Sequence, residues 1–238
     1  MSLNNNGRGP IGKLVQPPVD LLVCFAVKEE AKYFAVATEC FKGTLAGGMS
    51  CQTWITGMGR TNAAEGIRRA INLVRPERVI TAGFAGGLNP KYKFGTVLYD
   101  QDFLADFGPE LENCGAISGK FYCHKRVAIT ALEKAELWRS SGADAVEMES
   151  SVIRTICGEF KIPSATIRVI SDDATQDLPL DFNALMTSDD RIDYKRLIWN
   201  VLSQPTRIPK LVGFQRQTTD VARKLGAVLK GLLQAERR

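Results

Sequence analysis

The sequence predicts an α/β protein: a single doubly wound domain whose central, mixed but mostly parallel sheet is flanked by helices on both faces. Three observations support this fold class. Apolar strand-like runs alternate with segments of helical periodicity from one end of the chain to the other. Several strand-like runs are continuously apolar, as is typical of parallel strands that are buried on both faces. The chain of 238 residues is long enough to enclose the core of one large domain.

The composition is that of an ordinary soluble globular protein, with 45% hydrophobic and 24% charged residues. The net charge of +5 is mild and the basic residues are spread along the chain, which argues against nucleic-acid binding. The chain contains neither a signal peptide nor an apolar run of membrane-spanning length. We therefore expect a cytoplasmic protein.

Cysteine and histidine usage argues against the common metal centres. The six cysteines contain no Cys-x-x-Cys pair, and three of them lie in apolar runs, where a free cysteine acts as a small hydrophobic residue. This pattern favours a reducing compartment and no structural zinc. The single histidine, His124, excludes a multi-histidine metal site and makes a Ser-His-Asp triad unattractive. We expect neither a metal nor a cofactor.

The chain begins with a leader, residues 1–19, which is rich in Asn, Gly and Pro and is expected to be disordered. Residues 20–238 are expected to form the single domain, which opens with the apolar strand Asp20–Val27 and a helix from Lys28. Glu29 and Glu30 lie in the first turn of that helix. Paired acids there usually compensate the helix dipole, so these residues alone do not assign a function to Glu30.

Two glycine turns follow in the middle of the domain. The first, Gly57–Asn62, joins the strand Cys51–Thr56 to the helix Ala63–Val74, and the second, Gly83–Leu88, ends the strand Arg78–Ala82. Glycines next to a strand end let a ligand approach backbone N–H groups. The Gly-x-Gly of the first turn is a weak signal by itself, because it lacks the full dinucleotide fingerprint and the Walker lysine.

Apart from the two stretches described next, the rest of the chain is predicted to contain two more strands, one helix and a helical C-terminal region. The strands are expected at residues 94–104 and 115–122, the helix at 130–140, and the C-terminal helices at 192–202 and 218–233, with a break at Pro205–Pro209. Glu133 and Lys134 are expected on the solvent side of the helix at 130–140.

Two stretches organise the chemistry of the sequence. Gly142–Ser150 packs Glu147, Met148 and Glu149 together where an apolar strand gives way to a helix. Ser164–Ile170 is an apolar strand that ends in Ser171, Asp172 and Asp173. In an open α/β sheet, ligands bind at the carboxyl ends of the strands. The sequence thus predicts two carboxylates in one crevice, although a helix cap at Glu149 and a turn at Asp172 explain the same residues equally well.

In their order along the chain, four motifs resemble the nucleoside phosphorylase and nucleosidase superfamily, most closely its 5′-methylthioadenosine/S-adenosylhomocysteine nucleosidases. The motifs are Ala26–Ala31, Gly57–Arg60, Thr81–Leu88, and Val146–Glu149 taken with Arg168–Asp172. The resemblance implies the three-layer sandwich of the phosphorylase/hydrolase type. The segment Ser171–Phe182 is also similar to the hopanoid-associated nucleosidases of the same superfamily.

The resemblance implies catalytic roles for three residues. Asp172 matches the acid that protonates or hydrogen-bonds N7 of the leaving purine, which a carboxyl group can do when burial raises its pKa. Glu30 matches the carboxylate that activates the attacking water. Arg168 matches an arginine near that water, and we expect it to orient Glu30.

The same resemblance implies a set of substrate-binding residues. Glu149 matches the acceptor of hydrogen bonds from the ribose hydroxyls, and such an acceptor favours the positive charge that develops on the sugar. Met148 matches the apolar residue on the ribose face. Phe84 and Gly86, in the second glycine turn, are also placed among the substrate-binding residues. Phe84 departs from the family, which has a serine there, and no clear base-stacking motif is found.

The expected function is hydrolysis of the N-glycosidic bond of a purine nucleoside, with a 5′-modified adenosine as the expected substrate. The first alternative is a phosphate-dependent nucleoside phosphorylase. This is disfavoured because Glu30 would repel a phosphate anion. The second is a nucleoside-binding protein on the same fold that has little or no turnover. The reason for considering it is the bulky side chain of Phe84.

The expected partners are the nucleoside and a second copy of the chain, since the resemblance implies a homodimer. A basic and apolar C-terminal surface could also contact an anionic membrane, although packing within the fold is the commoner role of such residues. Its members are Arg196, Ile198, Trp199, Val201, Leu202, Arg207, Ile208, Lys210, Leu211, Val212, Phe214 and Arg216.

Overall fold

The structure is a computed structural model, and it describes residues 18–38, 43–44, 50–185, 187 and 208–235. Residues 1–17 of the predicted leader and the predicted helix at 192–202 lie outside these residues, as do six of the twelve members of the proposed membrane-contact surface. The end of the predicted leader is described, and Val19 already belongs to the first strand. No helix in the described ranges is both long enough and apolar enough to cross a membrane.

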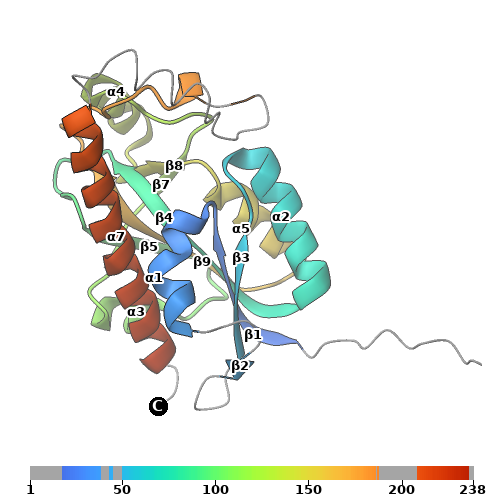
Figure 1. Cartoon of the computed structure of the whole chain (residues 1–238). Helices are drawn as coiled ribbons and strands as arrows, with labels where there is room; N and C mark the ends of the chain where they lie inside the picture. The colour runs from blue at the N-terminus through green and yellow to red at the C-terminus, as the bar shows by residue number, and fades with distance from the viewer. Residues whose placement is uncertain (1–17, 39–42, 45–49, 186, 188–207, 236–238) are drawn as a thin grey trace, which may run out of the picture.

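Strands and helices alternate through the described part of the chain (Figure 1). The strands are β1 (Val19–Phe25), β2 (Gly43–Thr44), β3 (Ser50–Ile55), β4 (Pro76–Gly87), β5 (Val97–Gln101), β6 (Ile117–Ser118), β7 (Phe121–Cys123), β8 (Ala145–Glu147) and β9 (Ser164–Asp172). The helices are α1 (Lys28–Thr38), α2 (Gly59–Val74), α3 (Gly108–Asn113), α4 (Ala131–Ser141), α5 (Ser150–Glu159) and α7 (Ile208–Ala235), with a 3-10 turn at Asn183–Leu185.

The strands form one mixed sheet in the order β2-β3-β1-β4-β9-β5-β6. Its centre is parallel, because β1 pairs in parallel with both β3 and β4, and β4 pairs in parallel with β9. β5 runs antiparallel to β9. β8 pairs antiparallel with the end of β4 and in parallel with β7, so it adds a short side branch beside the carboxyl ends of the central strands. The predicted mixed, mostly parallel sheet is confirmed.

Helices cover both faces of this sheet, which confirms the three-layer architecture (Figure 1). On one face, α1, α3 and α7 enclose an apolar cluster that includes Phe25, Phe34, Phe107 and Leu225. On the other face, α2 and α5 bury a smaller cluster that includes Ile67. The two clusters hold the central strands from opposite sides, so the ends of these strands are fixed in position.

Several element boundaries differ from the prediction, and two of the differences have a clear physical reason. The second glycine turn is not a turn: β4 continues through it to Gly87, because Gly86 and Gly87 pair with β8 and the end of β9. The last helix begins at Ile208 rather than at Thr218, so Pro209 lies in its first turn, where the missing N–H of a proline has no intrahelical partner to lose.

The contact between α1 and α7 depends on Gly226. A Cβ atom at this position would lie 2.9 Å from the backbone carbon of Tyr33. Replacement by alanine must therefore push the two helices apart. We expect Gly226→Ala to destabilise the fold by about 1–3 kcal/mol, the usual cost of an overpacked interface. Urea unfolding measured by circular dichroism tests this.

Gly213 on the same helix provides the matched control, because a Cβ atom there meets nothing within 4 Å. Gly213→Ala should be neutral or stabilising by up to about 1 kcal/mol, since alanine is the better helix former. Equal effects of the two substitutions would contradict the close contact.

Candidate active site

The carboxyl edge of the parallel strands gathers the polar residues that the sequence singled out. Glu30 lies at the start of α1, Glu149 directly before α5, and Arg168 and Asp172 on β9. All four are buried, with exposed fractions of 7%, 9%, 2% and 4%, respectively. Buried charges need partners, and each of these side chains has a defined set.

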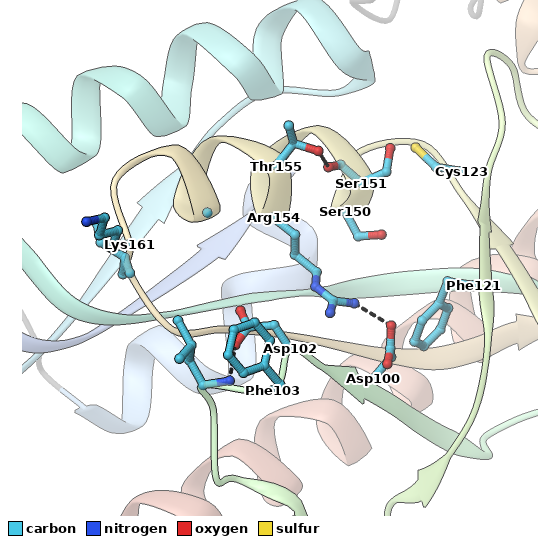
Figure 2. A pocket seen from close by; sticks show the side chains of 13 residues that line it. Asp100, Asp102, Phe103, Phe121, Cys123, Ser150, Ser151, Arg154, Thr155 and Lys161 are labelled. Atoms are coloured by element: carbon cyan, nitrogen blue, oxygen red, sulfur yellow. Dashed lines mark hydrogen bonds and ion pairs between the residues drawn. The ribbon is translucent and has the colours of Figure 1, made fainter.

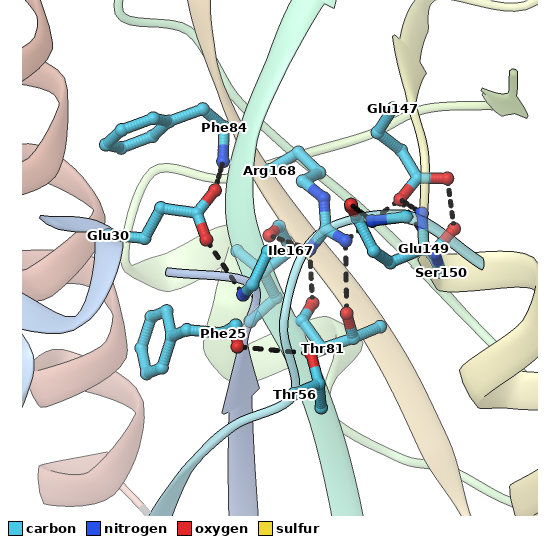
Figure 3. Close-up of polar contacts among 12 residues, drawn as sticks. Phe25, Glu30, Thr56, Thr81, Phe84, Glu147, Glu149, Ser150, Ile167 and Arg168 are labelled. Carbon is cyan, nitrogen blue, oxygen red and sulfur yellow. Dashed lines mark hydrogen bonds and ion pairs between the residues drawn. The ribbon is translucent and has the colours of Figure 1, made fainter. Parts of the chain in front are cut away.

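Glu30 is held by backbone N–H groups. Its Oε2 accepts hydrogen bonds from the N–H of Ala26 (2.9 Å) and Val27 (3.3 Å), and its Oε1 accepts one from the N–H of Phe84 (2.9 Å) (Figure 3). A Cβ atom on Gly83 would lie 2.5 Å from Oε1. The carboxylate of Glu30 therefore occupies the space that the glycine leaves open beside β4.

The surroundings of Glu30 raise its pKa above the usual value. Burial is the main cause, and it outweighs the opposing effects of the Arg168 charge and the three N–H donors. Glu30 therefore keeps its proton to a higher pH than an exposed glutamate does. A water-activating base must be ionised, so this base becomes available as the pH rises.

Arg168 does not orient Glu30 as the sequence analysis expected. Its guanidinium donates to the backbone oxygen of Thr81 (2.9 Å), to Thr81 Oγ1 (3.0 Å), and to Glu147 Oε2 in an ion pair of 2.9 Å. Among the described contacts, it acts on Glu30 only through its charge. Arginine suits the position because its planar group reaches several acceptors at once.

Glu147 is the partner that the sequence analysis missed. It lies at the end of β8, and its Oε2 also accepts hydrogen bonds from the N–H of Glu149 (3.0 Å) and Ser150 (2.7 Å). Burial raises its pKa, but Arg168 and these donors outweigh burial and hold the pKa below the usual value. Glu147 thus accepts the N–H groups at the start of α5 and is held ionised. The sequence did contain a signal for such a partner. An arginine inside an apolar strand is buried, and a buried arginine requires an acid nearby with which it can pair.

Glu149 is the least compensated of the acids. Its Oε1 accepts one hydrogen bond, from the N–H of Gly59 at the start of α2 (2.9 Å). Burial raises its pKa to about 7, assisted by the negative charges of Glu147 and Glu30. Figure 3 shows Glu149 beside Glu147 and Arg168, where the amino end of α5 begins. Glu149 therefore has acceptor capacity left for a ligand that donates hydrogen bonds.

Asp172 lies at the end of β9 between a hydroxyl and an ammonium group. Ser171 Oγ donates to its Oδ1 (2.6 Å), and Lys134 Nζ forms an ion pair with its Oδ2. The expected position of Lys134 on the solvent side of its helix was wrong: the side chain is fully buried. The helical pattern of α4 placed it outward because the segment that covers this face of α4 follows β9, about forty residues later.

Each of the three remaining predicted residues neighbours one of these acids, in the chain or in space. Met148 is half-buried between Glu147 and Glu149. Gly86 lies beside Asp172, since a Cβ atom there would approach Oδ2 to 3.3 Å. Phe84 gives its N–H to Glu30, while its ring packs against the apolar cluster under α1 and α7 and is turned away from Arg168 (Figure 3).

A separate cavity of about 860 Å³ opens beside α5 (Figure 2). Ser150 and Ser151 of α5 line it, together with Phe121 of β7 and the Arg154–Asp100 ion pair. Phe103 at its rim is 93% exposed. None of the predicted site residues lines this cavity, although Ser150 connects it to Glu147. In the described part of the chain, no group of three potential metal ligands is found.

Comparison with known proteins shows a similarity to one superfamily. The sequence profile of the phosphorylase superfamily matches residues 114–202, the segment that carries Lys134, Glu147, Glu149 and Asp172. The predicted resemblance to the nucleoside phosphorylase and nucleosidase superfamily is confirmed.

Within that class the similarity is to nucleosidases. A 5′-methylthioadenosine/S-adenosylhomocysteine nucleosidase of Glaesserella parasuis is 29% identical over 165 residues, which cover 55% of this chain and 71% of that protein. The crystal structure of the Campylobacter jejuni 5′-methylthioadenosine/S-adenosylhomocysteine nucleosidase has a TM-score of 0.67 at 14% identity and covers 91% of this chain and 99% of its own. The native futalosine hydrolase of Helicobacter pylori has a TM-score of 0.64 at 15% identity, with 91% and 98% covered. These relatives support the prediction of a nucleosidase-type enzyme, and the two structures confirm the fold.

The raised pKa of Glu149 predicts a pH-dependent stability. Because the folded pKa of about 7 lies above the ordinary value of 4.5, the folded state holds this proton more tightly than the unfolded state. The resulting stabilisation is complete below about pH 4.5 and is lost as the pH rises through about 7. Glu149→Gln removes the titration. As the pH rises from about 4.5 to about 7, the free energy of unfolding of this variant should therefore increase relative to that of the wild type by on the order of 1–3 kcal/mol.

Urea unfolding of both proteins across this pH range measures the difference. Glu136→Gln, at an exposed position on α4, should follow the wild-type curve. Parallel curves for Glu149→Gln and the wild type would show that Glu149 has an ordinary pKa.

Proposed function

We propose that the chain hydrolyses the N-glycosidic bond of a purine nucleoside and that its substrate is a 5′-modified adenosine. The observation that carries the proposal is the buried group of Glu30, Glu149 and Asp172 at one edge of the sheet. Each has a different set of partners, so each suits a different task. The nucleosidases among the similar proteins support the same reaction class.

Cleavage of this bond passes through a ribosyl cation and needs three kinds of help. The bond electrons move into the purine, so a proton at N7 makes the base a better leaving group. Asp172, between Ser171 and Lys134, is the group proposed to deliver it. Glu149 accepts hydrogen bonds from the ribose hydroxyls and favours the positive charge on the sugar. Glu30 takes a proton from the water that adds to the anomeric carbon.

The charges around the site favour water over phosphate as the nucleophile. Within the described part of the chain, Glu30, Glu147 and Glu149 lie around one guanidinium, that of Arg168. Its donors already serve Glu147, Thr81 and Ile167. A phosphate would need free cationic or N–H donors. The N–H at the start of α2, a natural anion site, already binds Glu149. A phosphorylase therefore has less support than a hydrolase.

A binding protein without turnover also has less support. This alternative was considered because of the bulk of Phe84 near the reacting centre. The ring packs with the core cluster on the α7 side, and only the backbone N–H of this residue reaches Glu30. The homodimer and the cytoplasmic location remain predictions.

The first test is base release without phosphate. Purified protein in phosphate-free buffer should release adenine from 5′-substituted adenosines, as measured by chromatography. Asp172→Asn removes the proton carrier while keeping the shape, and it should lower the rate by about a hundredfold or more. A rate that requires added phosphate would instead identify a phosphorylase.

The second test separates Glu30 from Glu149. Glu30 acts on water, so Glu30→Gln should lower kcat by about a hundredfold and leave nucleoside affinity nearly unchanged. Glu149→Gln should weaken both binding and turnover, because the ribose contact persists in both states. Single-turnover rates and calorimetric affinities measure the two effects.

The control for Glu30 is Glu29→Gln, which changes the exposed neighbour in the same helical turn. It should keep the wild-type rate. Because an amide at position 30 places an N–H₂ group against backbone donors, each variant is first checked for a cooperative unfolding transition. A folded Glu30→Gln with wild-type kcat would overturn the assignment.

A further inference from the structure

Lys134 is the most unusual charge in the structure. It is fully buried, with no exposed side-chain surface, and its Nζ has three acceptors. Two are the backbone oxygens of Asp173 (3.0 Å) and Gln176 (2.7 Å), and the third is Asp172 Oδ2. A buried lysine with all three donors used is costly to desolvate, so this arrangement calls for a reason beyond stability.

Several hydrogen bonds fix the position of Lys134. Thr130 Oγ1 caps α4 by accepting from the N–H of Glu133 (3.1 Å), and Glu133 Oε2 accepts in turn from the N–H of Ile129 (2.9 Å). The segment after β9 is tied to the same helix end, because Asp177 Oδ1 accepts from the N–H of Ala131 (2.7 Å). The helix and the loop thus form one unit that directs the ammonium at Asp172.

The acceptors divide into two fixed carbonyls and one carboxylate. A neutral lysine amine has two N–H donors and one lone pair. If Lys134 loses the proton that faces Asp172, its remaining two N–H groups still satisfy the oxygens of Asp173 and Gln176. Both protonation states therefore keep their hydrogen bonds, and only the Asp172 side of the contact changes.

We propose that Lys134 is a positioning residue for base departure: it holds Asp172 at the edge of the crevice and supplies the proton that Asp172 passes to the leaving purine. The inference rests on the proposed function and deepens it. Gly86 supports it independently, because the missing side chain there leaves Oδ2 of Asp172 uncovered by β4.

The step balances in protons and electrons. As the N-glycosidic bond breaks, its electron pair enters the purine, the Lys134 ammonium gives a proton to the Asp172 carboxylate, and Asp172 passes a proton to N7. Asp172 is then a carboxylate again and Lys134 is a neutral amine. Water adds to the anomeric carbon and gives its proton to Glu30. After the base leaves, solvent protons entering through Asp172 restore the ammonium, and Glu30 releases its proton to solvent.

Among the described residues, few other ionisable groups surround the pair. Asp173 follows Asp172, and its pKa is lowered because hydrogen bonds from Thr175 and the charges of Lys93 and Lys134 outweigh burial. Glu133 precedes Lys134 on α4 and pairs with Arg126 at 2.6 Å. The β4 and β8 sides of the pair are formed by Gly86 and Val146, which do not titrate.

The test is the pH–rate profile of Lys134→Met, which keeps the length of the side chain and removes the charge. In acid solution the carboxyl of the variant can take its proton directly from solvent, so the rate should stay within about threefold of the wild type. In alkaline solution that supply fails, whereas the wild type still draws on the ammonium, so the rate of the variant should fall by at least about tenfold. The alkaline limb of the profile therefore moves to lower pH. Lys120→Met, at an exposed position before β7, should leave the profile unchanged.

A merely structural lysine would lower the rate by the same factor at every pH, and that result would overturn the proposal. If the single variant does not fold, Asp172→Asn and Lys134→Met/Asp172→Asn decide. The double variant leaves no unpaired buried charge, and in Asp172→Asn the two backbone oxygens still accept hydrogen bonds from Lys134. Their rates should agree within about twofold, because Lys134 acts only through Asp172. A further loss in the double variant would overturn the proposal. A wild type that releases no base from any nucleoside would instead overturn the proposed function.

Discussion

The buried ion pair between Arg168 and Glu147 is the interaction on which the site depends. It joins β9 to the end of β8, and Arg168 also binds Thr81 on β4. Glu147 in turn accepts the first N–H groups of α5, so the same carboxylate sets the position of Glu149. Removing either partner would leave an unpaired charge inside the protein, which usually costs several kcal/mol. The pair fixes the frame in which the less compensated acids, Glu149 and Glu30, can retain raised pKa values.

The two ends of the site are tuned in opposite ways by their surroundings. On the Glu149 side, three carboxylates share one guanidinium, so negative charge is in excess and protons are held more tightly. On the Asp172 side, one carboxylate faces one ammonium, so the charges balance. A reaction that develops positive charge on a sugar and sends electrons into a base needs such an asymmetry. This difference in charge balance arises from the side chains that the starts of α4 and α5 bring to the site, and not from any unusual residue type.

Sequence patterns predicted the fold and much of the candidate site for identifiable reasons. Continuous apolar runs marked β1 and β9, and the polar residues at their ends indicated the edge of the sheet at which the buried acids lie. Prediction from hydrophobic periodicity failed where segments distant in the chain determine whether a residue is buried or a strand continues. Lys134 lies on a helix face that the loop after β9 covers, and β4 extends through its glycines because β8 and β9 pair with them. Glu147 was not identified because its partner, Arg168, follows it by 21 residues and meets it only in the folded chain.

Gly83 and Glu30 share one small volume, and this has a consequence for how the sequence can change. A methyl group on residue 83 would need the space that Oε1 of Glu30 fills, whereas a shorter acid at position 30 would leave that space empty. Substitutions at the two positions are therefore epistatic: a side chain at 83 becomes acceptable only after residue 30 has been shortened. The intermediate with the longer acid and the added methyl group is disfavoured, so the order of the two steps is constrained. Any lineage that keeps Glu30 is held to glycine at position 83.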